Sequence, residues 1–295
     1  MKKIDVHVHC IGWKNPISGS ENCAPTPDEL RISYKELNVE KGILLPEVNP
    51  ECMYMLQSNE EAEFLSNNNK DLLYWCCNID PRMGDNSSKT DFSNYLNLCK
   101  KRGAVGVGEI CVNMWADDPL MENLFYHCAE SDMPVIIHIG HKQYDCYGII
   151  DDLGLPRLEK ILKKYPKLKI LGHSQCFWSE ISDDVTVDNR YTNPQGKANG
   201  GRIVELMREC PNLYCDLSAN SGYNAMTRDP DFTYRFFEEF SDRIMYGSDI
   251  CRPFQERPLS AWLDESYEKG YLSEKNYGKI CRENAIRIFK LNEDF

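Results

Sequence analysis

Histidine and carboxylate residues end several apolar runs of this sequence, and their chemistry suits a divalent metal ion. His7 and His9 end the run that begins at Lys3. If this run is a strand, both imidazoles point to one side, because side chains alternate along a strand. Two imidazoles placed in this way can bind one borderline-soft cation such as zinc. The pair alone is a weak indication, since core or surface histidines share this spacing.

The same kind of ending recurs later in the chain. Glu109 ends a run that begins at Ala104, where a carboxylate is unfavourable to bury without a partner. His138, His173 and Asp249 end three further runs. A salt bridge or an isolated polar group would account for any one of these residues. Their joint occurrence, which takes in four of the six histidines of the chain, predicts a single metal site.

Such a site needs a scaffold that brings strand ends together, and the rest of the sequence predicts one. Short β-rich runs alternate with amphipathic helices. The strands are expected over residues 3–9, 42–48, 72–79, 104–111, 134–139, 169–173, 213–217 and 244–249. Two helices are expected to begin at the N-caps Thr26 and Ser58. The other helices are expected over residues 92–101, 119–130, 156–164, 202–209, 232–240, 261–269 and 274–289.

This alternation predicts an α/β fold, a closed (β/α)8 TIM barrel that forms a single domain over residues 1–295. An open, doubly wound sheet is the main alternative, but the first strand-to-helix turn lacks a glycine-rich phosphate loop. A barrel gathers its active-site residues at the C-terminal ends of its strands. The predicted scaffold therefore suits the predicted ligands.

The overall composition restricts the class of partner. A formal net charge of -12 disfavours binding to nucleic acid, whose phosphates carry the same sign. No run approaches the length of a membrane span, and the start of the chain lacks the pattern of a signal peptide. The 14 cysteines form no C-x-x-C motif, which favours reduced thiols in a cytoplasmic protein. A small-molecule substrate, with no membrane partner, is expected.

Three segments resemble the amidohydrolase superfamily, and the likeness covers nearly the whole chain. The first-strand motif of that family is similar to Asp5-Val6-His7-Val8-His9. The segments 246–249 and 283–289 resemble its amidohydrolase-related branch, which contains both hydrolases and nonoxidative decarboxylases. The resemblance implies metal ligands at His138, His173 and Asp249, and it also suggests a homodimer.

Glu109 is similar to the metal-bridging glutamate of the TatD-type deoxyribonucleases. Those proteins continue with Gly-Leu-Asp, whereas Cys111 and two further residues follow here. The glutamate favours two ions, the first held by His7, His9 and Asp249 and the second by His138 and His173. With one ion, His173 would instead polarise the substrate or act as acid or base. The expected ion is zinc, with manganese, iron or cobalt as alternatives.

The predicted function is hydrolysis of an amide, ester or lactone of a small organic acid. A metal ion lowers the pKa of a bound water from about 15.7 toward about 7. Asp249 and His173 are the expected catalytic residues, and Arg252 and His141 are candidate substrate contacts. A nonoxidative decarboxylase, a TatD-like phosphoesterase or nuclease, and a noncatalytic binding barrel are the alternatives.

Overall fold

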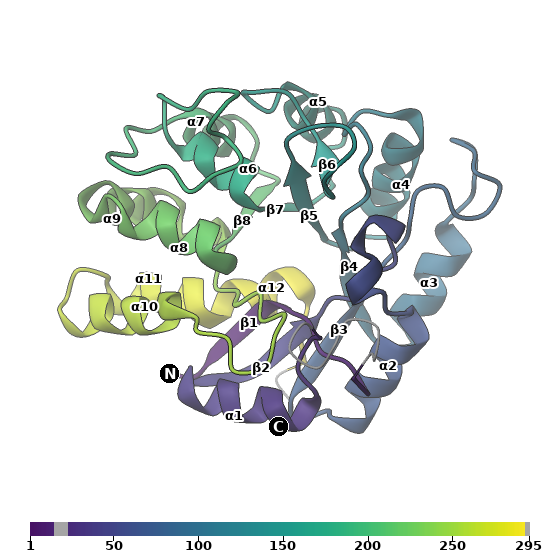
Figure 1. Ribbon diagram of the computed structural model, residues 1–295, viewed down its shortest axis with the longest axis horizontal. Helices are drawn as coiled ribbons and strands as arrows, with labels where there is room; N and C mark the ends of the chain where they lie inside the picture. Colours follow the sequence, from purple (N-terminus) through teal and green to yellow (C-terminus); the bar gives the residue numbers. More distant parts are fainter. Residues whose placement is uncertain (15–22, 293–295) are drawn as a thin grey trace.

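Eight parallel strands form a ring at the centre of the computed structural model, which describes residues 1–14 and 23–292. Figure 1 shows this ring enclosed by the helices. A ninth strand, β6 (Ile149–Ile150), pairs only with β5. The strands of the ring, in their order around it, are β1 (Lys3–Val8), β2 (Val39–Leu44), β3 (Leu73–Cys77), β4 (Ala104–Ile110), β5 (Val135–Gly140), β7 (Ile170–His173), β8 (Leu213–Asp216) and β9 (Ile244–Met245).

The ring closes between its first and last strands. The Val6 N–H donates to the carbonyl oxygen of Tyr246 at 3.0 Å, and the His9 N–H donates to that of Ile250 at 3.0 Å. An open sheet would leave these edge groups unpaired. The predicted (β/α)8 TIM barrel is therefore confirmed, and the doubly wound sheet is excluded.

The helices lie mostly where the sequence predicts them. The Thr26 N–H donates to the Glu29 carboxylate at 2.8 Å, and the Ser58 hydroxyl accepts from the Glu61 N–H at 3.2 Å. These two caps start the first two helices. The main helices are α1 (Pro27–Glu36), α2 (Asn59–Asn68), α3 (Ser93–Lys101), α4 (Pro119–Glu130), α5 (Pro156–Lys164), α7 (Arg202–Glu209), α9 (Pro230–Phe240) and α10 (Pro258–Glu268).

Several elements differ from the prediction. The second strand begins at Val39 rather than Gly42, because Val39 and Lys41 pair with Lys3 and Ile4 of β1. Lys41 is buried there with its ammonium 3.6 Å from the ring centre of Tyr74. The expected helix over 274–289 contains a π-helical turn. Two helices and β6 lie in segments expected to be loops. The two helices in expected loops are α6 (Gln175–Trp178) and α8 (Ala219–Thr227). The π-helical turn separates α11 (Glu274–Gly278) from α12 (Asn284–Phe289).

A small apolar cluster inside the ring sets the direction of the strand-end residues. Seven of the eight ring strands supply its buried members, and α12 adds Ala285, Ile288 and Phe289. Ile136 and Leu171 belong to this cluster, and His138 and His173 follow each of them by two residues. Because side chains alternate along a strand, both imidazoles face the barrel interior beyond the apolar layer.

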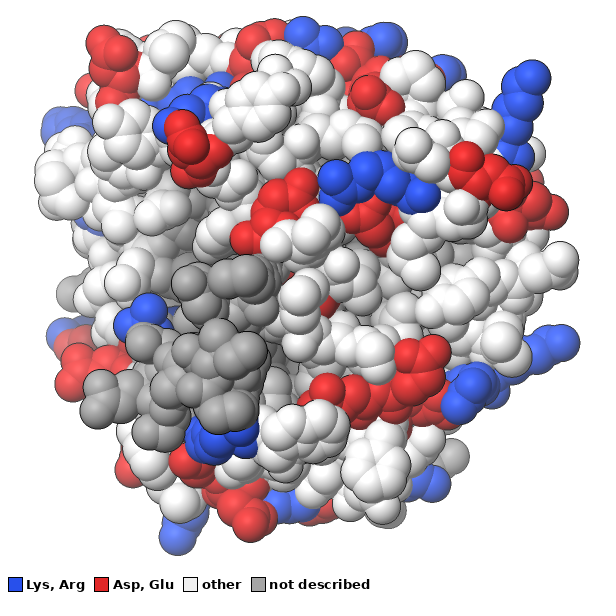
Figure 2. Space-filling model, turned by 45° about the vertical axis from the view of Figure 1, so that its right-hand side comes forward, with Lys and Arg blue, Asp and Glu red and all other residues white. Residues whose placement is uncertain are grey.

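The surface carries mixed charge. Over the described part of the face in Figure 2, basic side chains are scattered among acidic ones rather than gathered in one field. Among the described residues, no helix combines the length and the apolar character needed to cross a bilayer.

Candidate metal centre

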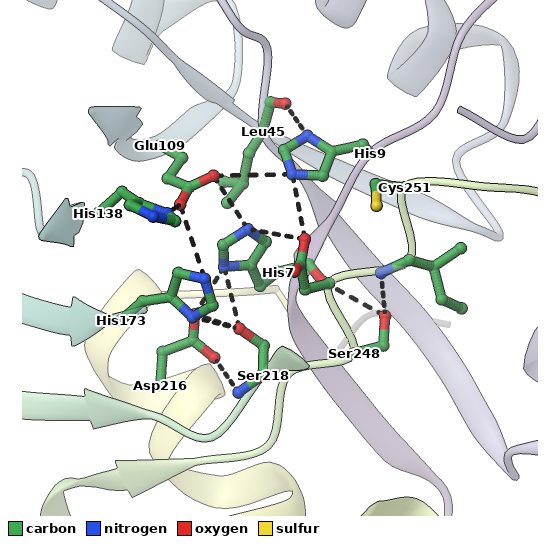
Figure 3. Close-up of polar contacts among 12 residues, drawn as sticks. His7, His9, Leu45, Glu109, His138, His173, Asp216, Ser218, Ser248 and Cys251 are labelled. Carbon is green, nitrogen blue, oxygen red and sulfur yellow. Dashed lines mark hydrogen bonds and ion pairs between the residues drawn. The ribbon is translucent and has the colours of Figure 1, made fainter. Parts of the chain in front are cut away.

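All six predicted ligands meet at the C-terminal ends of the strands. Figure 3 labels His7, His9, Glu109, His138 and His173 at this meeting point. They come from strands, or from residues just after strands, that are distant in the sequence. The contributing elements are β1 (His7) with the residue directly after it (His9), β4 (Glu109), β5 (His138), β7 (His173) and the segment after β9 (Asp249).

The Glu109 carboxylate stands between two pairs of imidazoles. Its Oε2 atom lies 3.3 Å from Nε2 of His7 and 3.7 Å from Nε2 of His9. Its Oε1 atom lies 2.8 Å from Nδ1 of His138 and 3.8 Å from Nε2 of His173. One oxygen thus serves each pair, which is the arrangement that a carboxylate between two cations requires.

Asp249 joins the first of these pairs. Its Oδ1 atom lies 3.5 Å from Nε2 of His9 and 3.7 Å from Nε2 of His7. One donor atom from each of these three residues lies within 4.8 Å of the others. The group matches the set that the sequence predicts for a first ion.

The outer nitrogens of the first pair are held by acceptors. Nδ1 of His7 lies 2.6 Å from the Asp216 carboxylate, and Nδ1 of His9 lies 3.1 Å from the Leu45 carbonyl oxygen. Because both partners can only accept, each Nδ1 carries the hydrogen. The Nε2 lone pairs are therefore turned toward the centre, as in histidines that bind metal.

Ser218 fixes the third imidazole in the same way. Its hydroxyl donates to Oδ2 of Asp216 at 2.9 Å, so its oxygen accepts from Nδ1 of His173 at 2.8 Å. This leaves the Nε2 lone pair of His173 free. Among the described residues, the Nε2 atom of His7 is buried without a hydrogen-bond partner of ordinary geometry, and it faces Oε2 of Glu109 at 3.3 Å. Three converging nitrogen donors, one of them unpartnered, and two carboxylates fit a divalent cation of the zinc type.

The negative charges of the two carboxylates also favour a bound cation. Burial opposes ionisation of Glu109, yet His7 and His138 hold the pKa of its carboxyl well below the usual value. Burial likewise opposes ionisation of Asp249, but His9, His7 and His173 lower its pKa to about 2. Burial and the neighbouring His7 lower the pKa of His173 to about 4. Near neutral pH the centre therefore offers ionised carboxylates and a neutral His173.

Asp216 and Ser218 are functional residues that the sequence analysis missed. Both are fully buried, and they orient His7 and His173 from behind. A signal for Asp216 was present, because this carboxylate ends an apolar run in the same way as Glu109. Ser218 gave no such signal, since its role depends on the contact between β8 and β7.

Replacing Asp216 by asparagine is expected to weaken metal binding about 10- to 100-fold, because the acceptor that orients His7 loses its charge. Competition with a chromogenic chelator measures this affinity. The matched control is Asp151→Asn, since the Asp151 carboxylate instead accepts from the N–H groups of Arg157 and Leu158. Equal affinities in the two variants would contradict the role of Asp216.

Asp5 holds the backbone segment that carries Asp249. The Asp5 carboxylate accepts from the backbone N–H groups of His7 at 3.0 Å and Ser248 at 2.8 Å, which ties β1 to the segment after β9. Asp249 has a φ of 51°, an uncommon value for a residue other than glycine. Strained backbone of this kind persists where surrounding contacts over-determine it, and it clusters at functional sites.

An alanine at position 247 is expected to destabilise the protein by about 1–3 kcal/mol, as overpacking of a dense core does. Its Cβ would lie 2.4 Å from Oδ1 of Asp216 and 2.8 Å from Cβ of Ser218. Urea unfolding measures the loss. Gly12→Ala is the control, because its Cβ would approach Glu61 only to 3.5 Å. A Gly247→Ala protein as stable as this control would refute the close packing.

The two candidate substrate contacts lie outside the cluster of ligands. Arg252 is exposed, and the His141 ring stacks on Tyr191 with ring centres 4.7 Å apart. Among the six predicted ligands, Asp249 and His138 have the most exposed side chains, at 21% and 14%. The ring centre of Tyr147, which the sequence analysis did not single out, lies 4.6 Å from that of His138. Solvent therefore reaches the centre on the side of Asp249, His138 and Tyr147.

Comparison with known proteins assigns the chain to a family. A sequence model of the family described as Amidohydrolase matches residues 55–291. No curated protein sequence matches the chain at a significant level.

Solved structures share the fold over nearly the whole chain. A TIM-barrel protein from Bordetella bronchiseptica superposes with a TM-score of 0.67 at 15% identity, covering 98% of this chain and 99% of that one. A probable 2-pyrone-4,6-dicarboxylic acid hydrolase from Acinetobacter baumannii gives 0.59 at 15% identity, covering 99% and 100%. A 5-carboxyvanillate decarboxylase from Sphingomonas paucimobilis gives 0.59 at 12% identity, covering 99% of each chain. The common barrel thus occurs in structures named as hydrolases and as decarboxylases.

Proposed function

The chain belongs to the amidohydrolase family, and on this premise we propose that it is a metal-dependent hydrolase of a small organic acid derivative. The bond cleaved is that of an amide, an ester or a lactone. The observation that carries the proposal is the convergence of four imidazoles and two carboxylates at one end of the barrel. The position of Glu109 between the two imidazole pairs supports binding of two ions.

The distances among the six ligands divide them into two sets, one for each proposed ion. His7, His9 and Asp249 would hold one ion, His138 and His173 the other, and Glu109 would contact both. A divalent cation there supplies Lewis acidity, which polarises a carbonyl oxygen and makes water more acidic. Zinc is the expected ion, because imidazole nitrogens dominate the donor set. Manganese, iron and cobalt are the alternatives to be compared in reconstitution.

Asp249 is the proposed proton carrier. Its carboxylate is ionised near neutral pH, since its pKa is about 2, and it is partly exposed on the open side of the centre. It can therefore accept a proton from water and return it to a leaving group. His173 remains neutral near neutral pH, with its Nδ1 atom held by the Ser218 hydroxyl.

Glu109 favours hydrolysis over decarboxylation. A hydrolase must bring a water and a carbonyl group together, and a carboxylate between two cation sites suits that task. A nonoxidative decarboxylase needs only one ion, and it remains the second candidate. Homodimer formation, cytoplasmic location and the single-domain organisation stay predictions of the sequence.

A substrate panel tests the proposal. The metal-reconstituted protein is incubated with lactones, esters and amides of small mono- and dicarboxylic acids, and acid release is followed by proton uptake or release. Turnover of one of these classes is expected. Aromatic and unsaturated carboxylic acids, followed by release of CO2, and p-nitrophenyl phosphate form the other arms. Turnover in either of those arms alone would overturn the assignment as a carboxylic acid hydrolase.

A further inference from the structure

Two cysteines and a carboxylate form a second group of potential metal ligands beside the imidazole centre. Glu47 follows β2, Cys52 lies in the short 3-10 segment Pro50–Met55, and Cys111 comes directly after β4. One donor atom from each residue lies within 4.8 Å of the other two. The Sγ atom of Cys111 is 3.5 Å from Oε1 of Glu47. Three segments of the chain thus bring two thiols and one carboxylate to one point.

The Glu47 carboxylate is left incompletely paired. The residue is 4% exposed, and its Oε2 atom is buried without a hydrogen-bond partner among the described residues. Glu47 also lies in a group with His9 and Glu109 whose donor atoms fall within 4.8 Å of one another. An unpaired carboxylate oxygen beside a second carboxylate is unfavourable in a buried place. A cation bound at Glu47 would satisfy it.

The ligand positions are held by the surrounding backbone and side chains. The Cys111 N–H donates to Oδ1 of Asn49 at 2.9 Å, and the Asn49 amide donates to the Asp80 carboxylate at 2.9 Å. The Glu47 carbonyl oxygen accepts from the Gln57 N–H at 2.8 Å. Asn49 is fully buried. These contacts orient Glu47 and Cys111 in advance, which is what a binding site requires.

We propose that Glu47, Cys52 and Cys111 form an additional cation site for a thiophilic divalent ion of the zinc type. Zinc lies about 2.3 Å from sulfur and about 2.0–2.2 Å from a carboxylate oxygen, so the ligands of one ion lie a few ångströms apart. The observed spread within 4.8 Å needs only small side-chain movements. Thiolate sulfur selects zinc over magnesium or calcium. The site adjoins the imidazole centre, because Glu47 also lies in a group with His9 and Glu109, and Cys111 lies in a group with Glu109 and His138.

Cobalt substitution tests this site by a thiolate signal, and Cys52→Ser separates the site from an ion that Cys111 would hold with Glu109 and His138. The metal-free protein is titrated with Co2+, and the near-ultraviolet thiolate-to-cobalt charge-transfer band is recorded. An ion held only by nitrogen and oxygen gives no such band. The wild-type protein is expected to show it, and Cys52→Ser and Cys111→Ser are each expected to lose it. Cys251→Ser is the control, since that half-buried thiol contacts Gln255 instead.

The outcomes separate the possibilities. Absence of the band in the wild-type protein, or its loss in Cys251→Ser, would overturn the site. A band that survives Cys52→Ser but not Cys111→Ser would mean that Cys111 alone binds an ion, which also overturns the three-ligand site. Thermal unfolding of each variant verifies the fold, and Cys52→Ser, at a half-buried position, keeps the test valid if Cys111→Ser fails to fold. The signal is independent of hydrolase activity.

Discussion

An Asp249→Asn protein is expected to remain folded and to lose about two to four orders of magnitude in kcat, the usual contribution of a positioned acid-base group. The carboxylate, with a pKa of about 2, is ionised near neutral pH and has a lone pair that can take a proton during the reaction, whereas an amide does not. Asparagine also suits the backbone, because it tolerates the φ of 51° at this position better than most residues. The loss should therefore be chemical rather than structural.

Steady-state kinetics on the substrate found in the panel measure this effect, and thermal unfolding monitors the fold. Asp242→Asn is the matched control, because that carboxylate pairs with Lys279 on the surface at 2.6 Å. The control should turn over at the wild-type rate. Turnover by Asp249→Asn within a few-fold of that rate would remove Asp249 from the mechanism.

Removing the Glu109 side chain is expected to release an ion and to abolish most of the activity. Its two oxygens face different imidazole pairs, at 3.3 Å from His7 and 2.8 Å from His138. In Glu109→Ala the pair of His138 and His173 keeps no carboxylate ligand, so the ion expected there should be lost first. Metal analysis by plasma emission, run beside the wild-type protein, measures the difference.

The control for this experiment is Glu180→Gln, another buried carboxylate, which faces Arg190 at 3.4 Å rather than the imidazoles. Its metal content should equal that of the wild-type protein. A Glu109→Ala protein with unchanged metal content would contradict the bridging position and would favour a single ion. The decarboxylase alternative would then gain support.

Local sequence patterns predicted most of the fold. The helices α4, α5 and α7 begin and end where the sequence places them. Pro119 and Pro156 mark the starts of α4 and α5, and apolar spacing marks the extent of all three. The strand-end rule also brought His7, His138 and His173 together, since parallel strands in a closed barrel share one C-terminal edge. This result requires only that the strands run parallel to one another, and it does not depend on their exact register.

The residues that act through tertiary contacts were less predictable. The Leu45 carbonyl oxygen that holds His9 is a backbone atom, which no residue type announces. Ser218 acts because β8 lies beside β7, and Glu47 lies beyond the end of its strand. Short elements such as β6 depend on pairing with β5, so their own sequence carries little signal.

The most direct test of metal-dependent hydrolysis is to measure metal content and hydrolase activity on the same sample of the purified protein, before and after removal of metal by a chelator. We predict at least two divalent ions per chain, loss of activity together with the ions, and recovery on addition of zinc. A metal-free protein that retains full hydrolase activity would contradict metal-dependent hydrolysis at this centre.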